Sequence, residues 1–233
     1  MNFLKQLLHN VFQKDAETFL TNSFRQVSPE QMEAHLAVSK YGKFRLTDAI
    51  RPSFDLKVCP TEAFRYDSYY DSENKISIPV LIGSVSREKL FDTFLDQLDM
   101  LGPVVDVVLE SSYGHHPVKH SCFLRENIDT PVLKSVLYDY EELLLHDGCA
   151  GIAVMNSDIS REVQFDEHKL LFIYGEGLRE CESVFLERGI PNNPNVHFLT
   201  EAEHVHSSRE SYRRQFEQLK IRLGMDDWTP AEN

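Results

Sequence analysis

The sequence has no long apolar run, few cysteines and a deficit of basic side chains. No stretch approaches the ~18 apolar residues that a membrane-spanning helix requires, so a transmembrane protein is not expected. Lys and Arg number 24 against 37 Asp and Glu, which gives a formal net charge of −13. Nonspecific nucleic-acid binding and docking on anionic membranes both depend on positive charge. The composition therefore predicts neither of these partners.

Cysteine is scarce and follows no pattern. The four cysteines lie far apart, and no two of them form a C-x-x-C pair. In a chain of 233 residues, such cysteines are typical of a reduced, cytoplasmic protein. Hydrophobic residues make up 42% of the chain, which is enough for a core without disulfides. We therefore expect an acidic, soluble, folded protein.

No catalytic or nucleotide-binding fingerprint is present. The chain lacks a G-x-S-x-G motif, and Gly175-x-Gly177 fails the dinucleotide pattern because Glu180 replaces the third glycine. A turn that contains Ser84 and Ser86 follows a predicted strand and opens a predicted helix, where backbone N–H groups could hold an anion. Ordinary helix capping by Ser86 is the preferred interpretation.

The apolar pattern divides the chain into an extension, a main domain and a tail. Residues 1–24 carry apolar side chains on one helical face and few basic residues on the other. This favours a helix that packs against a protein over one that lies on a membrane. We place a helical and irregular extension at residues 1–74, an α/β domain at 75–224 and a loose acidic tail at 225–233.

Strands and helices alternate from Ile76 onwards. The strands are expected at 76–82, 104–109, 151–155, 163–165, 170–174 and 196–199, with helices that begin near Ser86, Thr130, Leu178 and Ser207. This order predicts a ferredoxin-like split β-α-β core with an extra leading β-α unit and N-terminal helices. The alternative is a doubly wound, three-layer α/β fold.

The main candidate for a ligand site is the segment that ends at Cys122. His115, His116 and His120 precede this cysteine, and imidazole and thiolate both bind zinc and related metals. The segment belongs to a connection of roughly twenty residues, which is longer than a usual loop. The competing interpretation is an ordinary, partly exposed loop, because the spacing matches no known zinc motif.

A second argument for this site depends on topology. In the ferredoxin-like order, the strands that begin at Val104 and Leu170 are parallel neighbours, and their following loops leave the same edge of the sheet. A carboxylate beside a histidine at that edge would form an acid–base pair. The residues expected there are Glu110, His115, His120, Glu176 and Arg179.

Two further histidine motifs lie closer to the C-terminus. The sequence Asp166-Glu167-His168 is expected in a turn, where satisfied turn chemistry is preferred over a metal ligand. We expect His204 and His206 to project to opposite sides of a strand, which argues against joint ligation.

The sequence favours a non-catalytic binding or protein-interaction module, because its polar residues do not converge in a pattern that requires catalysis. Segment 1–24 is the expected contact for a protein partner or for a homodimer. The alternative is a metal-assisted hydrolase centred on the His115–Cys122 loop, with a divalent metal such as zinc.

Overall fold

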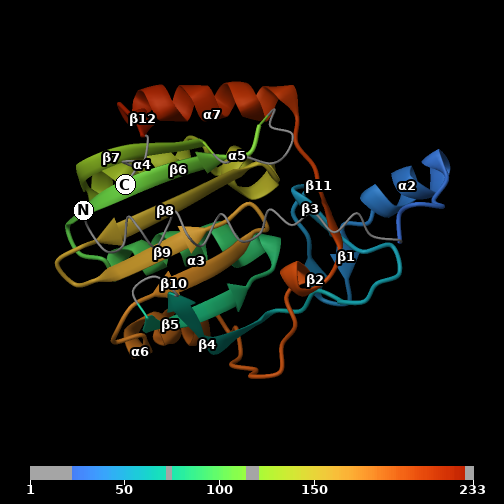
Figure 1. The fold of residues 1–233 in the computed structure, drawn as a ribbon, viewed down its shortest axis with the longest axis horizontal. Coiled ribbons are helices and arrows are strands. Elements are labelled where there is room, and N and C mark those ends of the chain that lie inside the picture. The colour runs from blue at the N-terminus through green and yellow to red at the C-terminus, as the bar shows by residue number, and fades with distance from the viewer. Residues whose placement is uncertain (1–22, 72–74, 114–120, 229–233) are drawn as a thin grey trace.

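The computed structural model describes residues 23–71, 75–113 and 121–228 and contains a large mixed core (Figure 1). The strands of the main sheet are β4 (Ala63–Asp71), β5 (Ile76–Ser84), β6 (Val104–Ser111), β7 (Ser121–Asp129), β8 (Ala150–Asn156), β9 (Arg161–Phe165), β10 (Leu170–Tyr174) and β12 (Asp226–Trp228). Their order across the sheet is β12-β7-β6-β8-β9-β10-β5-β4. Every neighbouring pair is antiparallel.

The helices that pack on this sheet share one of its faces. They are α3 (Arg87–Asp99), α4 (Thr130–Tyr138), α5 (Glu141–His146), α6 (Arg179–Glu187) and α7 (Glu210–Arg222). Their apolar stripes form one buried cluster with alternate residues of the strands, such as Val107 on β6 and Ile152 on β8. Gly83 on β5 permits this packing, because an added Cβ would lie 2.4 Å from a ring carbon of Phe185.

Local sequence signals explain the helix positions. Leu90, Phe94 and Leu98 follow one another at intervals of four residues in α3 and are all buried. Residue Gly102 follows this helix with φ +92°, a conformation that favours glycine. Thr130-Pro131 opens α4 with proline in its first turn, as the sequence predicts.

The opposite face of the sheet carries a second apolar cluster and a row of polar side chains. Val80, Val108 and Met155 belong to this cluster, together with Val196 and Phe198 from the segment before β11. Because side chains alternate along a strand, Glu110, Glu162 and Gln164 fall on the same face as these residues.

A small substructure joins distant parts of the chain beside the sheet (Figure 1). It contains α2 (Pro29–Leu36), β1 (Lys40–Tyr41), β2 (Phe44–Arg45), β3 (Ile50–Pro52) and β11 (His204–His206). Strand β11 pairs antiparallel with β3 to form a two-stranded ribbon. The short 3₁₀ helix Leu199–Glu201 precedes β11 and contributes Leu199 to a small core with Leu46.

The predicted mixture of α and β structure is confirmed, but the predicted topology is wrong. Strands β6 and β10 were expected to be parallel neighbours, yet β8 and β9 lie between them and β10 runs opposite to β6. Short turns join β8 to β9 and β9 to β10, and strands joined in this way pair antiparallel. The ferredoxin-like order and the doubly wound alternative both require parallel pairs that the sheet does not contain.

The sheet also extends beyond the predicted domain limits. Strand β4 pairs with β5 from Ala63 to Asp71, so the sheet crosses the boundary placed at residue 74. Residues 226–228, expected in a loose tail, form β12 against β7. Residues 196–199 were expected as a strand but do not join a sheet.

Most of the helix predicted at residues 1–24 lies outside the described residues. None of the described helices is long and apolar enough to cross a bilayer.

Candidate metal centre

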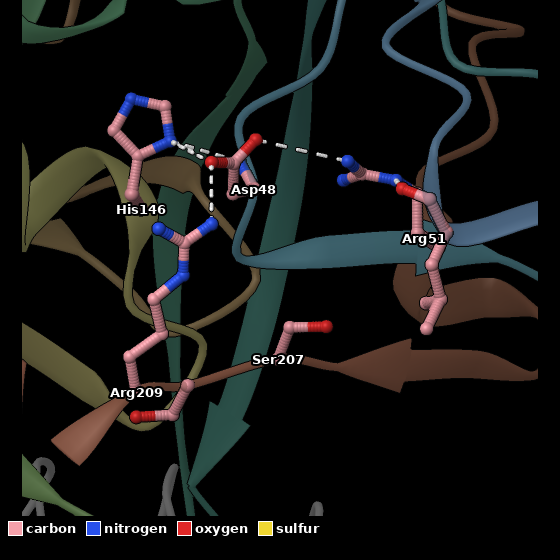
Figure 2. Close-up of a pocket in the computed structure, with 7 residues that line it drawn as sticks. Asp48, Arg51, His146, Ser207 and Arg209 are labelled. Atoms are coloured by element: carbon pink, nitrogen blue, oxygen red, sulfur yellow. Dashed lines mark hydrogen bonds and ion pairs between the residues drawn. The ribbon is translucent and has the colours of Figure 1, made fainter. Parts of the chain in front are cut away.

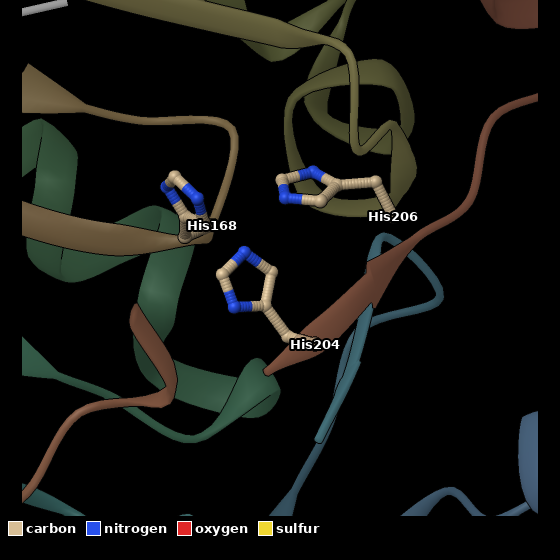
Figure 3. A group of neighbouring side chains, drawn as sticks. All are labelled: His168, His204 and His206. Atoms are coloured by element: carbon tan, nitrogen blue, oxygen red, sulfur yellow. The ribbon is translucent and has the colours of Figure 1, made fainter. Parts of the chain in front are cut away.

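Three histidines from two distant parts of the chain converge beside the sheet. His168 lies in the turn between β9 and β10, and His204 and His206 lie on β11 (Figure 3). One ligand atom from each side chain lies within 4.8 Å of the other two. The ring centroids are 4.8–5.0 Å apart, and a ring nitrogen of each faces the space between them (Figure 3).

The β9–β10 turn holds His168 through Asp166. The backbone N–H of Leu170 donates to Asp166 Oδ1 at 2.8 Å, and His168 Nδ1 lies 2.7 Å from Asp166 Oδ2. Lys169 has φ +63° at the end of this turn, and its Nζ donates to the Ala150 carbonyl at 3.0 Å. The predicted turn chemistry is therefore present, and the same carboxylate also orients the histidine.

His204 and His206 share one face of β11. The expectation that they project oppositely is wrong, because positions two apart on a strand point to the same side. The pairing of His204 with Pro52 and of His206 with Ile50 fixes the register of the ribbon. Beyond the ribbon, Ser207 N donates to the Ala49 carbonyl at 2.8 Å, which extends the antiparallel contact.

Hydrogen bonds set the tautomer of each imidazole. The Nδ1 of His204 lies 2.8 Å from the Ala202 carbonyl, and that of His206 lies 2.6 Å from the Gly148 carbonyl. A carbonyl only accepts, so both Nδ1 atoms carry the proton and both Nε2 atoms carry the lone pair. Asp166 Oδ2 accepts from His168 Nδ1 in the same way, so the neutral form of His168 also carries its lone pair on Nε2. Metal-binding histidines in proteins are held by second hydrogen bonds of this kind.

Burial keeps the two β11 imidazoles neutral. It is the largest cause that lowers the pKa of His206, to about 3, and repulsion by the protonated forms of His168 and His204 adds to the effect. The pKa of His204 is also lowered by burial and by the charge of His168, against the carbonyls of Ala202 and Leu199. A neutral imidazole is the form that binds a metal.

The donor set fits zinc or a similar transition metal. Zinc binds histidine nitrogen at about 2.0 Å with tetrahedral geometry, which places three ligand nitrogens roughly 3.3 Å apart. The histidine nitrogens here lie within 4.8 Å of one another, so small side-chain rotations would bring them to those positions. In the described part of the chain no carboxylate or thiolate joins this group as a further ligand.

The residues predicted to share one site do not come together. Glu110 is near the C-terminal end of β6, whereas Glu176 and Arg179 follow the C-terminal end of the antiparallel strand β10, at the opposite end of the sheet. Glu176 and Arg179 are both exposed. The proposed acid–base pairing across these loops is therefore wrong, because it assumed parallel strands. His115, His116 and His120 lie outside the described residues.

Glu110 and Cys122 do contact each other. They are cross-strand partners on β6 and β7, and the Cys122 thiol lies 3.6 Å from Glu110 Oε1. Burial raises the pKa of Glu110 well above its ordinary value, and the nearby Glu162 carboxyl adds to the effect. Burial and the Glu110 charge also raise the pKa of the Cys122 thiol. Because a metal binds the thiolate and the carboxylate, a pair whose charged forms are both disfavoured by burial is a poor metal site.

The anion site predicted at Ser84 and Ser86 is filled by the protein's own acids. The Ser86 N–H donates to Glu62 Oε1 at 3.2 Å, and its hydroxyl donates to Glu88. Ser84 is a buried residue at the end of β5. The residue Ser86 occupies the N-cap position of α3, but its side chain makes no capping hydrogen bond.

Sequence reasoning considered both histidine motifs but did not connect them. The His-x-His spacing of β11 carried a usable signal, because this spacing places two imidazoles on one face of any strand. Nothing in the sequence showed that the turn at His168 lies against that face. No family model matches the chain, and it matches neither a curated protein nor a solved structure.

Proposed function

We propose that this protein is a metal-binding module that holds one divalent transition metal, with zinc the best fit, on His168, His204 and His206. The observation that carries the proposal is that one ligand atom of each histidine lies within 4.8 Å of the other two, while each Nδ1 has a hydrogen-bond partner, Asp166, Ala202 or Gly148.

The metal would connect two parts of the chain that lie far apart in the sequence. His168 belongs to the main sheet, whereas His204 and His206 belong to the ribbon formed with β3. A shared ion therefore stabilises the docking of the ribbon and of the substructure that contains it. Binding free energy of this kind adds to the folding free energy.

The same donor set also bears on the hydrolase alternative. Three histidines leave a fourth position for water or for a group on a partner, as in catalytic zinc sites. Asp166, the carboxylate that contacts His168, also accepts a hydrogen bond from the Leu170 N–H. Since a hydrolase needs a base that is free to accept a proton, this arrangement favours binding over catalysis.

Metal analysis with two matched variants tests the proposal. The purified protein is stripped with a chelator, reconstituted with zinc and analysed for bound metal. The triple variant H168A/H204A/H206A should lose the metal, and H115A/H116A/H120A should retain it. Each variant removes three histidines, so a general loss of imidazole cannot explain a difference. Far-UV circular dichroism establishes that both variants are folded.

The outcomes separate the two sites. Loss of zinc only in the H115A/H116A/H120A variant would overturn the three-histidine centre and support the hydrolase site in the His115–Cys122 loop. Failure of the unmodified protein to bind zinc would overturn both. Retention of zinc by both variants would also contradict the proposal.

We also propose, from the sequence, that the protein is cytoplasmic, binds no nucleic acid and self-associates or binds a protein through residues 1–24. The low and unpatterned cysteine content supports the location, and all four cysteines are unpaired. Light scattering of the full chain and of a variant that lacks residues 1–24 tests the association. A full-length monomer that binds no protein would contradict it.

A further inference from the structure

The ribbon has a second face, and that face lines a pocket. Arg51 on β3 is opposite Val205 on β11, so both project away from the side that carries His204 and His206. The pocket has a volume of about 290 Å³. It is lined by Leu36, Asp48, Arg51, His146, Ser207, Ser208 and Arg209.

Two guanidinium groups face one carboxylate in this pocket. Figure 2 shows Asp48 between Arg51 and Arg209, with interactions to both. Arg51 Nη2 lies 3.8 Å from Asp48 Oδ1, and Arg209 Nη2 lies 3.5 Å from Asp48 Oδ2. Both distances exceed the 2.7–2.9 Å or so of a direct guanidinium–carboxylate hydrogen bond. Asp48 therefore balances part of the charge without using these donors.

Arg51 is held rigidly with one side left free. Its Nε donates to the Leu36 carbonyl at 2.9 Å, and its Nη1 donates to the carbonyls of Thr47 and Ile50. The residue is only 5% exposed. Among the described residues, Nη2 makes no hydrogen bond and has only the distant Asp48 carboxylate as its partner. A buried guanidinium with an unused donor that faces a pocket is suited to bind an incoming anion.

The N-terminus of α7 opens at the same pocket. Arg209 is the N-cap residue of this 13-residue helix, and no side chain caps the first turn. Ser207 and Ser208 line the pocket immediately before the helix. The first backbone N–H groups of a helix and its dipole both favour an anion.

We propose that this pocket binds the phosphate group of a small phosphorylated ligand, through Arg51, Arg209 and the N-terminus of α7. Two guanidinium groups from different elements, beside a helix N-terminus, match the several oxygen atoms of a phosphate better than they match a single carboxylate. The net charge of −13 would repel a long polyanion. Asp48 competes with the ligand, because its carboxylate lies between the two guanidinium groups.

Calorimetric titration with inorganic phosphate tests the proposal. The protein is used in full length and metal-free, with chelator removed, so that phosphate cannot bind to a metal at the three histidines. R209Q should weaken phosphate binding by about tenfold, since it removes one charged donor. D48N should tighten binding by about tenfold, because it removes the competing charge. R222Q, at the other end of α7, is the matched control and should bind as the unmodified protein does.

Each result bears on the pocket and not on the metal centre. Absence of phosphate binding by the unmodified protein would overturn the inference, as would R209Q and R222Q variants with equal affinity. An unchanged or weaker affinity in D48N would contradict the role of the competing carboxylate. The H168A/H204A/H206A variant should still bind phosphate, because the pocket does not use these histidines. Phosphate binding can therefore be tested even if the protein binds no metal.

Discussion

Replacement of the buried acid Glu162 by glutamine should stabilise the protein, and increasingly so as the pH rises. Glu162 lies on β9 and is fully buried. Its Oε1 accepts a hydrogen bond from Gln164, and its Oε2 has no hydrogen-bond partner. Burial raises the pKa of Glu162 from 4.5 to about 8, against the hydrogen bond from Gln164. Glutamine has nearly the same shape and cannot ionise.

The sign and size of the effect follow from proton linkage. Between pH 4.5 and about 8, the unfolded chain has released a proton that folded Glu162 retains, so rising pH favours unfolding. At about 1.4 kcal/mol per pKa unit, the destabilisation is roughly 1 kcal/mol at pH 5 and roughly 3 kcal/mol at pH 7. The advantage of E162Q should therefore grow by about 2 kcal/mol over this range.

Other buried groups do not obscure this measurement. Burial lowers the pKa of Lys169 to about 8, so its ammonium is charged in both states between pH 5 and 7. Glu110 has a raised pKa and acts in the same direction as Glu162, but it is present in both proteins. The difference in unfolding free energy between E162Q and the unmodified protein therefore reports the ionisation of Glu162, together with its effect on the pKa of Glu110.

Urea unfolding at pH 5 and pH 7, followed by circular dichroism with chelator present, measures this difference. The exposed variant E187Q is the control and should stay within about 0.5 kcal/mol of the unmodified protein at both pH values. A stability difference between E162Q and the unmodified protein that does not change from pH 5 to pH 7 would refute the raised pKa. A destabilised E162Q would show that the carboxyl makes a contact that glutamine cannot replace.

Three further substitutions test the site and the core. D166N should weaken zinc binding by about 10–100-fold in a competition with a chromophoric chelator, because an amide N–H favours the wrong tautomer of His168; unchanged affinity would contradict its orienting role. G148A should lower the melting temperature, since its Cβ would lie 2.3 Å from the Ala49 carbonyl oxygen; an unchanged melting temperature would contradict this close approach. F94A should cost about 3–5 kcal/mol in urea unfolding, because Phe94 is fully buried against Phe165; a loss below 1 kcal/mol or so would contradict this packing.

Local chemistry allowed several elements to be located from the sequence alone. Helices α3 and α4 begin where the sequence predicts, close to Ser86 and Thr130, and the apolar side chains on one face of each helix are buried. The turn at Asp166 was also identified from its residue types. These features depend on hydrogen bonds and side-chain contacts within a few residues, so a short segment of sequence is enough to predict them.

The order of the strands could not be obtained in this way. Alternating apolar residues show that a segment is a strand, but they do not show which strand is its neighbour. The segment at 121–129 was not identified as a strand, because Arg125, Glu126 and Asn127 interrupt its apolar pattern and Asn127 has φ +55° at an irregularity in the β6–β7 pairing. Without β7, the predicted order of strands and helices matched that of a ferredoxin-like core.

The histidine centre shows the same division between local and tertiary information. The sequence by itself determined that Asp166 and His168 share a turn. It also placed His204 and His206 two positions apart on one strand, but the prediction that they project to opposite sides was wrong. Only the tertiary structure decided that these two features meet, because the β9–β10 turn lies beside a strand about forty positions later in the chain, and that strand is held by pairing with the more distant β3. Such contacts depend on the packing of the whole chain, and no local pattern encodes them.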